Sequence, residues 1–359
     1  MNLPSHGANP HYLYEKLGLA MPKNIIDFSA NINPLGPPGI LKENWDSFYE
    51  QMQVYPDPEG RILKRKIAEN EKISEQVVLL GNGAAELLAL VGRMLAGKKV
   101  LLIQPTFSEY EKVCRANGCE VHYYIMNDLD WQLDLEKIKE IIHQVDAVFL
   151  CNPNNPTGIY YQKGALLVLL KECVQHDCYF ILDEAFYDFV PAYENMIPEQ
   201  KNYPSLIIVR SMTKMFSIPG IRLGYMVANP SVIKKMAEFQ PHWSLNSIAL
   251  KTGELLLEEK AFVAETIQYV EKEKQVLAPF YAKMGLNITN SQANFYLLKD
   301  PLYDKQHAFL QFLLKEGIVA RHTYNYPGLD GRWLRFAIKN RQENERLQGV
   351  MTKWMKTQR

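Results

Sequence analysis

The lysine at position 214 has an unusual setting for a charged residue. It lies between apolar residues in an irregular stretch, and the hydroxyl residues Ser211 and Thr213 precede it. An amine in apolar surroundings has a lowered pKa and is nucleophilic. Arg222 follows eight residues later, so the two hydroxyls and the guanidinium would form an anion site beside the amine. Taken alone, a lysine is more often a solvated surface residue.

A carboxylate at Asp183 follows directly on the apolar run 178–182. This position is the end of a buried strand, where an unpaired charge is costly and needs a cationic partner. For a single aspartate, a helix cap or a structural ion pair is the plainer alternative.

Two loops between predicted strands and helices carry groups that could bind a ligand. Residues 81–84 read Gly-Asn-Gly-Ala before a helix, where free N–H groups and the helix dipole favour a phosphate, although such turns are often simple connections. Glu86 stands where a dinucleotide-binding loop has its third glycine, so a dinucleotide is not favoured. Residues 152–158 read Asn-Pro-Asn-Asn-Pro-Thr-Gly, which is either a fixed array of amide donors and acceptors or a turn-rich connection.

The elements that must position these residues alternate along the chain. Six short apolar runs, separated by helical patterns, read as buried strands: 77–80, 100–103, 147–150, 179–182, 205–209 and 223–227. This pattern indicates an α/β protein, with a parallel or mixed sheet covered on both faces. Ligands bind beyond the carboxyl ends of such strands, where the residues above collect.

The remainder of the chain has a different pattern. Residues 246–284 are mostly helical, and short strands and helices follow: strands at 294–298, 318–321 and 333–338, a helix at 305–316, and a terminal helix. This α+β pattern predicts a second, smaller domain, in keeping with the two domains that the length suggests.

Composition excludes several classes of protein. The 359 residues carry 40 Lys+Arg and 40 Asp+Glu, so there is no net charge to favour a nucleic-acid partner. The apolar runs are too short to span a membrane, and the N-terminus has no signal-peptide pattern. Five scattered cysteines fit buried thiols in a reducing cytoplasm better than a metal site. We expect a cytoplasmic enzyme without a metal.

Together, five motifs resemble those of the fold-type I aminotransferases, which use pyridoxal 5′-phosphate. The motifs are Gly-Asn-Gly-Ala at 81–84, the asparagine-proline loop at 152–158, Asp-Glu-Ala at 183–185, Ser-Met-Thr-Lys at 211–214 and Arg-Leu-Gly-Tyr at 222–225. The resemblance implies this cofactor, a homodimer with shared active sites and a three-layer αβα large domain with a mostly parallel sheet. It implies that this domain spans 45–255, and that a smaller substrate-closing domain joins 1–44 to 256–359.

The resemblance also implies roles for single residues. Lys214 matches the lysine that binds the cofactor covalently and later moves a proton, and Asp183 matches the carboxylate that keeps the pyridine nitrogen protonated. Asn155 matches the amide donor to the ring's phenolic oxygen, and Phe107 matches the aromatic residue that stacks on the ring. The residues that match the phosphate site are Gly83, Ala84, Ser211, Thr213, Arg222 and, from the neighbouring subunit, Tyr55.

More narrowly, several segments resemble the threonine-phosphate decarboxylases, which are near relatives of the histidinol-phosphate aminotransferases: 6–9, 27–36, 183–186 and 325–330. Phe186 replaces a tyrosine that many aminotransferases have, and the decarboxylases share this change. The family's His-Gly-Gly-Asn reads His-Gly-Ala-Asn here, with Ala8 at the third position. The resemblance implies that a phosphorylated amino acid binds to His6, Asn31, Arg321 and Arg335, with Lys339 as a further candidate.

Arg335 matches the arginine that clamps the substrate carboxylate, but the sequence does not assign the other cations between carboxylate and phosphate. A decarboxylase holds the Cα–carboxylate bond perpendicular to the cofactor ring, whereas an aminotransferase holds Cα–H there. A firmly bound substrate phosphate could set that rotation.

The resemblance therefore predicts decarboxylation of L-threonine O-3-phosphate to (R)-1-amino-2-propanol O-2-phosphate in cobalamin biosynthesis. Histidinol-phosphate aminotransferase activity is the alternative within the family. A non-catalytic ligand sensor on the same fold is a third possibility. Lys214 and Asp183 argue against it, as does the lack of room for a DNA-binding domain.

Overall fold

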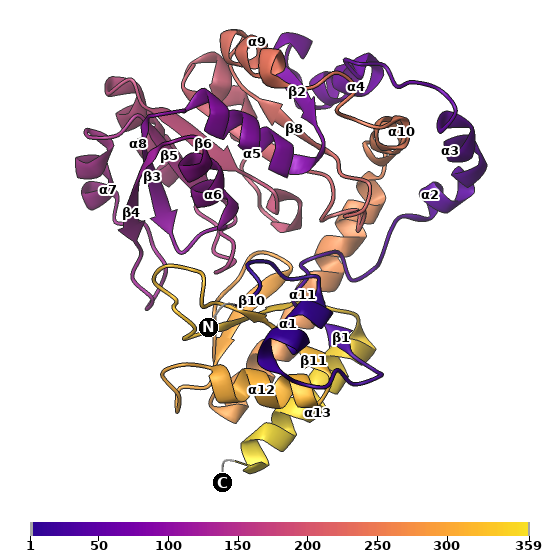
Figure 1. Ribbon diagram of the computed structural model, residues 1–359, viewed down its shortest axis with the longest axis vertical. Coiled ribbons are helices and arrows are strands. Elements are labelled where there is room, and N and C mark those ends of the chain that lie inside the picture. The colour runs from indigo at the N-terminus through magenta and orange to yellow at the C-terminus, as the bar shows by residue number, and fades with distance from the viewer. Residues whose placement is uncertain (1–2, 358–359) are drawn as a thin grey trace.

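The computed structural model describes residues 3–357, and a seven-stranded sheet organises the larger part of the molecule (Figure 1). The strand order is β2-β8-β7-β6-β5-β3-β4. Only β8 runs antiparallel to its neighbours, and all other pairs are parallel. The strand bounds are Val78–Gly81 (β2), Lys99–Gln104 (β3), Glu120–Ile125 (β4), Ala147–Cys151 (β5), Tyr179–Asp183 (β6), Leu206–Ser211 (β7) and Gly224–Val227 (β8).

Side chains along the inner strands alternate between two hydrophobic cores. In β3, Leu101 and Ile103 pack in one core, while Val100 and Leu102 pack in the other. Helices cover both faces: α4 (Arg61–Glu71), α7 (Leu135–Ile142) and α8 (Lys163–Gln175) contribute to the first core, and α5 (Gly83–Met94), α6 (Glu109–Ala116) and α9 (Pro230–Phe239) to the second. The expected three-layer α/β architecture with a mostly parallel sheet is confirmed.

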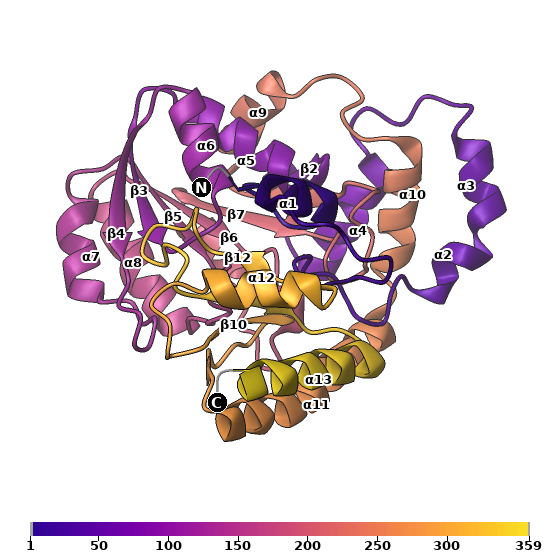
Figure 2. The same cartoon turned by 60° about the horizontal axis from the view of Figure 1, so that its bottom comes forward.

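The smaller part contains a four-stranded antiparallel sheet in the order β12-β13-β10-β9. Its strands are β9 (Asn287–Ile288), β10 (Phe295–Lys299), β12 (Arg321–His322) and β13 (Leu334–Ala337). Helices α1 (Pro10–Leu17), α11 (Lys260–Met284), α12 (His307–Lys315) and α13 (Arg341–Thr357) pack in this part (Figures 1 and 2).

The N-terminal segment is hydrogen-bonded to the C-terminal part of the chain. Strand β1 (Ile26–Asp27) pairs in parallel with β11 (Ile318–Val319). The N–H of Phe28 donates to the carbonyl of Val319 at 2.9 Å. This pairing supports our proposal that residues 1–44 and 256–359 form one discontinuous domain beside a domain of residues 45–255.

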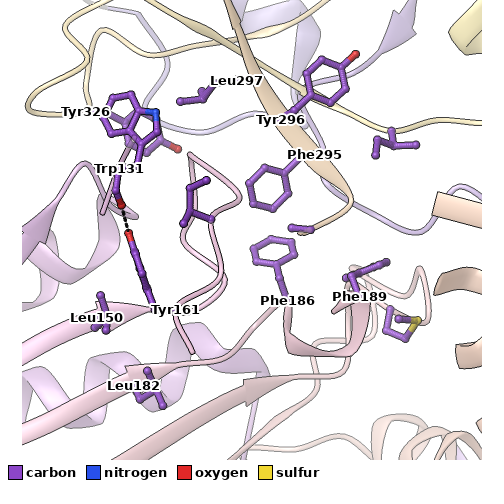
Figure 3. Packing of buried hydrophobic residues seen from close by; sticks show 14 of the residues in the cluster. Trp131, Leu150, Tyr161, Leu182, Phe186, Phe189, Phe295, Tyr296, Leu297 and Tyr326 are labelled. Atoms are coloured by element: carbon purple, nitrogen blue, oxygen red, sulfur yellow. Dashed lines mark hydrogen bonds between the residues drawn. The ribbon is translucent and has the colours of Figure 1, made fainter. Parts of the chain in front are cut away.

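Aromatic packing joins the two parts into one continuous core. Phe186, from the larger part, meets Phe295 of β10 edge-to-face, with ring centroids 4.8 Å apart (Figure 3). The Tyr161 hydroxyl donates to the carbonyl of Trp131 at 3.0 Å in the same region. The remaining elements are α2 (Gly39–Glu43), α3 (Trp45–Gln51), α10 (Ser247–Leu256) and the 3-10 turns Glu75–Val77, Tyr187–Phe189 and Ile197–Lys201.

Two differences from the sequence prediction have physical causes. Strand β4 was not predicted, because it lies at the sheet edge and carries exposed or half-exposed polar residues such as Glu120 and His122 instead of a continuous apolar run. The predicted strand at 318–321 is two short strands, β11 and β12, which pair in different sheets. Among the described helices, none has the length and apolar character needed to cross a membrane.

Candidate active site

A cavity of about 460 Å³ lies where the carboxyl ends of the central strands face the smaller part. Side chains from both parts line it, including a segment near the N-terminus. Of the residues that the sequence analysis selected, the cavity is lined by His6, Asn31, Ala84, Phe107, Asn155, Asp183, Ser211, Thr213, Lys214, Arg222, Arg321 and Arg335. Gly83 lies directly beside this cavity, whereas Tyr55 is 82% exposed and packs on Trp243. Lys339 is not among the described lining residues.

The Asp183 carboxylate is buried at the end of β6 and held by two donors. The Tyr110 hydroxyl donates to Oδ2 at 2.6 Å, and the N–H of Ala185 donates to Oδ1 at 2.9 Å. Burial raises the pKa of Asp183 to about 6, although both hydrogen bonds favour the ionised form. The carboxylate therefore has a fixed orientation where it lines the cavity. It can share a proton with a basic nitrogen of a ligand bound there.

Lys214 stands in the irregular segment after β7, and its side chain lines the cavity. Burial is the main cause that lowers its pKa to about 8, followed by the charges of Arg335 and Arg222, while Asp183 acts in the opposite direction. The loop is fixed through its backbone, because the N–H of Asn33 donates to the carbonyl of Lys214 at 3.1 Å. Lys214 therefore has the lowered amine pKa that its apolar setting predicted.

An anion cradle lies between the start of α5 and the loop after β7. Gly83 begins α5 with φ of +73°, and a Cβ there would lie 2.9 Å from Cζ of Arg222 and closer still to Nη2. The guanidinium therefore lies directly against the glycine backbone. Ser211 and Thr213 share a 2.8 Å hydrogen bond between their hydroxyls. Helix N–H groups, two hydroxyls and one guanidinium are a donor set that suits a phosphate.

Two arginines of the smaller sheet face each other on the opposite wall. The strand register places Arg321 of β12 directly across from Arg335 of β13. Burial lowers the pKa of Arg321 to about 10 and also lowers the pKa of Arg335. Like charges opposite one another destabilise a strand pair, so this arrangement favours an anion between or beside the two groups.

The partners of Arg335 leave part of its donor set available. Nη1 donates to Oδ1 of Asn155 at 2.6 Å and Nη2 to the carbonyl of Ser29 at 2.8 Å. Its Nε, and Oδ1 of Asn31, are buried without a partner in the part of the chain that the structure describes. Since the Asn155 oxygen accepts from Arg335, the Asn155 amide nitrogen is the group left to donate into the cavity.

The N-terminal segment reaches the cavity because Arg321 of β12 is hydrogen-bonded to it. Nη2 of Arg321 donates to the carbonyl of Ser5 at 2.5 Å and to Oδ1 of Asn325 at 2.7 Å. His6 then lies with Nε2 2.8 Å from Oε1 of Glu109. Ala8 adopts a left-handed φ of +67°, so the turn keeps a conformation that suits glycine although alanine stands there.

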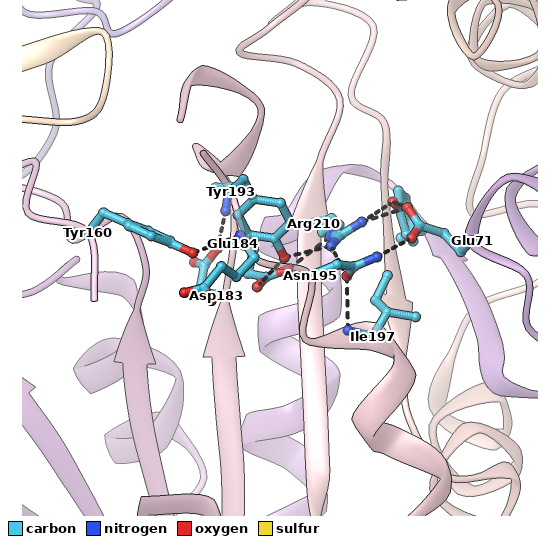
Figure 4. A network of polar contacts seen from close by, with 11 residues as sticks. Glu71, Tyr160, Asp183, Glu184, Tyr193, Asn195, Ile197 and Arg210 are labelled. Carbon is cyan, nitrogen blue, oxygen red and sulfur yellow. Dashed lines mark hydrogen bonds and ion pairs between the residues drawn. The ribbon is translucent and has the colours of Figure 1, made fainter. Parts of the chain in front are cut away.

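A second charged cluster, centred on Arg210 of β7, lies outside the residues that line the cavity (Figure 4). Its Nε donates to Glu184 at 2.9 Å and its Nη1 to Glu71 at 2.6 Å. Nη2 donates to the Tyr193 hydroxyl at 2.8 Å, and the guanidinium lies over the Tyr187 ring. Two carboxylates therefore compensate this buried cation, whereas the hydrogen bonds described for Arg321 and Arg335 of the cavity go to neutral groups.

Some lining residues were not selected from the sequence as functional. Tyr110 lies 73 positions before the Asp183 that it contacts. One feature of the sequence could have pointed to Tyr110, since it follows Phe107 by three residues at the start of a helix. In the structure the two rings meet edge-to-face, with centroids 5.7 Å apart. Tyr326, Ser29 and Asp27 also line the cavity. Phe186 lines it too.

Comparison with known proteins identifies the family. The model of "Aminotransferase class I and II" matches residues 23–350. The chain belongs to this aminotransferase family. Its enzymes depend on pyridoxal phosphate, so the chain is a pyridoxal-phosphate enzyme of a family that includes both lyases and transaminases.

Individual relatives include both kinds of enzyme. The threonine-phosphate decarboxylase of Salmonella typhimurium is 34% identical over 96% of this chain and 94% of its own. A histidinol-phosphate aminotransferase of Geobacillus is 29% identical over 93% and 91% of the two chains. Among solved structures, histidinol-phosphate aminotransferase from Clostridium acetobutylicum is similar at 32% identity with a TM-score of 0.86, over 92% of this chain and 99% of its own.

The residues of the cavity fit the cofactor of this family. The cradle at Gly83 and Arg222 has the donors and the backbone clearance that a phosphate needs. Asp183 is a buried carboxylate that suits a protonated ring nitrogen, and Lys214 has an amine of lowered pKa that suits an aldehyde. Pyridoxal phosphate, when bound, supplies a conjugated ring that accepts electrons from the substrate's Cα.

We expect Gly83→Ala to weaken binding of pyridoxal phosphate by about tenfold or more. An alanine Cβ would displace the Arg222 guanidinium from the cradle, and a hydrogen bond to a charged group contributes about 1.5–3 kcal/mol, where about 1.4 kcal/mol corresponds to tenfold in affinity. Fluorescence titration of the cofactor-free protein measures this change. Gly164→Ala is the matched control, because a Cβ at Gly164 meets nothing within 4 Å. Equal affinity in both variants would contradict the cradle.

We expect the rate at which the cofactor-free protein captures pyridoxal phosphate to rise with pH and to be half-maximal near pH 8. Only the neutral amine attacks an aldehyde, and the Lys214 pKa is about 8 instead of 10.5. Arg335→Met removes a cation that lowers this pKa, so its profile should move to higher pH. Stopped-flow absorbance provides the profiles, with Arg332→Met, an arginine paired with Asp128, as the control. An unshifted Arg335→Met profile would show that the two charges do not interact.

Proposed function

We propose that this enzyme decarboxylates L-threonine O-3-phosphate to (R)-1-amino-2-propanol O-2-phosphate, as a step of cobalamin biosynthesis in the cytoplasm. The observation that carries the proposal is the excess of cations in one cavity. Lys214, Arg222, Arg321 and Arg335 line it, against two carboxylates, those of Asp183 and Asp27. A cofactor phosphate would compensate Arg222, which leaves the two facing arginines for a substrate with two anionic groups.

In this proposal each part of the cavity has one task. Asp183 holds the proton of the cofactor's ring nitrogen, since its carboxylate is fixed by Tyr110 and Ala185. The Asn155 amide donates to the ring's phenolic oxygen, and Phe107 stacks on the ring. Gly83, Ala84, Ser211, Thr213 and Arg222 hold the phosphate. The Lys214 amine binds the cofactor and moves a proton at the substrate's Cα.

The substrate's position follows from the two-arginine wall. We assign the carboxylate to Arg335, whose unpartnered Nε and whose contact with Asn155 place it next to the cofactor side of the cavity. Arg321 and His6, with Asn31, are then left for the phosphate. When the protein binds the remote substrate phosphate firmly, it fixes the rotation about the bond between the substrate's nitrogen and Cα. This rotation decides whether carbon dioxide or a proton leaves Cα.

Relatives support the decarboxylase more than the transaminase. The Salmonella typhimurium enzyme and a putative threonine-phosphate decarboxylase of Caldanaerobacter subterraneus, 35% identical, are both more similar in sequence than the histidinol-phosphate aminotransferase of Geobacillus at 29%. A bifunctional protein of adenosylcobalamin biosynthesis from Leptospira interrogans is 31% identical over 97% of this chain and 40% of its own length. Histidinol-phosphate aminotransferase activity remains the second candidate, because the enzyme from Clostridium acetobutylicum is 32% identical and its structure superimposes with a TM-score of 0.86.

Product analysis with threonine phosphate tests the reaction directly. We expect release of carbon dioxide and formation of a phosphorylated amine, with the nitrogen retained, detected by mass spectrometry. Lys214→Ala should lose both the activity and the visible absorbance of the lysine–cofactor linkage. A keto product, or turnover of histidinol phosphate with 2-oxoglutarate in its place, would assign the enzyme as the aminotransferase instead.

We also propose that the enzyme is a homodimer in which Tyr55 reaches the cofactor phosphate of the neighbouring subunit. Helices α2 and α3 stand away from the body in both views (Figures 1 and 2), and large apolar side chains are exposed nearby. These are Trp45, Tyr49, Met52, Val54, Tyr55 and Trp243. A second copy of the chain would cover this apolar surface.

Sedimentation velocity tests the assembly. We expect twice the mass of one chain for the wild type, and one chain mass with weaker cofactor binding for Trp45→Glu, because a charge would be buried in the contact. Leu129→Glu changes an exposed apolar residue outside this surface and should stay dimeric. A wild-type enzyme that sediments as one chain would overturn the proposal.

A further inference from the structure

Two histidines and a glutamate meet on the surface, outside the lining of the active-site cavity. His143 directly follows α7, Glu172 lies near the end of α8, and His176 directly follows α8. The two helices lie side by side in both views (Figures 1 and 2). Nothing in the proposed reaction uses these three side chains.

The three side chains point their polar atoms at one another. Nε2 of His143 lies 2.8 Å from Oε1 of Glu172, and Nε2 of His176 lies 3.4 Å from the same oxygen. One ligand atom from each residue falls within a group no wider than 4.8 Å. The arrangement therefore brings two ring nitrogens and a carboxylate oxygen to one point.

The two imidazole rings are stacked, with centroids 4.0 Å apart and planes inclined by 28°. The hydrogen bond with His143 is the main cause that lowers the pKa of Glu172. Lys139 also faces Glu172, but its ammonium is paired with Glu136 at 2.9 Å.

We propose that His143, Glu172 and His176 form a binding site for a divalent transition-metal ion of the zinc class. Nitrogen and carboxylate ligands hold zinc at about 2.0–2.2 Å, which places tetrahedral ligand atoms about 3.4 Å apart. The His176–Glu172 separation of 3.4 Å equals this value, and the hydrogen-bonded His143–Glu172 pair, at 2.8 Å, would open by about 0.6 Å to admit the ion. Two imidazoles and one carboxylate suit Zn²⁺, Ni²⁺ or Cu²⁺, whereas Mg²⁺ and Ca²⁺ prefer oxygen ligands.

The position of the site defines what the ion does. Glu172 and His176 are four residues apart, so they share one face of the chain at the end of α8, and His143 reaches them from the end of α7. A bound ion therefore links the ends of two helices that cover the same face of the large sheet. Three protein ligands leave a coordination position for water, and the side chains are accessible, with the His143 side chain 47% exposed. The ion stabilises this helix pair and takes no part in catalysis.

Zinc titration of the holoenzyme, after dialysis against a chelator, tests the proposal. Equilibrium dialysis with metal analysis should give one Zn²⁺ ion per chain at this site, and a thermal melt should show a higher midpoint that a chelator reverses. Mg²⁺ should leave the midpoint unchanged. A wild-type enzyme that binds no Zn²⁺ under these conditions would refute the site.

Variants locate the ion. The double change His143→Ala/His176→Ala should lose this Zn²⁺ ion and the shift in melting midpoint while keeping the visible absorbance of the bound cofactor. His11→Ala removes an exposed histidine of α1 and should bind Zn²⁺ like the wild type. Glu172→Gln, which keeps the side-chain shape, gives a second test should the double variant not fold. Undiminished zinc binding in these variants would place the ion elsewhere and overturn the proposal.

Discussion

The active site depends on an electrostatic constraint: cations are held close together in a buried cavity with too few carboxylates to compensate them. The β12–β13 register sets Arg321 across from Arg335, and the charges of Arg335 and Arg222 act on Lys214. Burial lowers the pKa of each of these arginines in the smaller sheet. Burying uncompensated cations raises the free energy of the folded protein when the cavity holds only water. Anions that enter the cavity relieve this unfavourable free energy, which strengthens their binding. The whole chain nevertheless carries no net charge.

Arg210 shows how the same fold treats a buried cation with no ligand to bind. Its guanidinium is hydrogen-bonded to Glu184, Glu71 and Tyr193, so its charge is compensated within the protein and does not need a ligand. Arg210 and Asp183 lie on neighbouring strands, and Glu184 directly follows Asp183. Adjacent positions of the chain therefore serve opposite purposes: one carboxylate completes a structural ion pair, and the other remains available at the cavity floor.

Much of this site can be predicted because its main residues lie at strand ends. Asp183 stands out because it follows an apolar run, and Lys214 because it lies between apolar residues in an irregular stretch; the structure brings both to one cavity. The contact of Tyr110 with Asp183 is different, because it depends on how α6 packs on the sheet, which no local pattern encodes. Arg321 and Arg335 were selected only through the family resemblance, since a short strand pair decides that they face each other. Edge strand β4 was missed because its half-exposed residues carry no continuous apolar signal.

The pairing of β1 with β11 has a consequence for biosynthesis. The ribosome releases residues 26–27 long before 318–319, whereas the strands of the large sheet lie within residues 78–227. The sheet's contacts can thus form while the start of the chain still waits for its partner. Ser5 also reaches its final position only after residue 321 has been synthesised, because Arg321 donates a hydrogen bond to its carbonyl. Since non-local pairings form late, the cavity is completed only after β12 and β13 have been synthesised, and translation of these two strands precedes any activity.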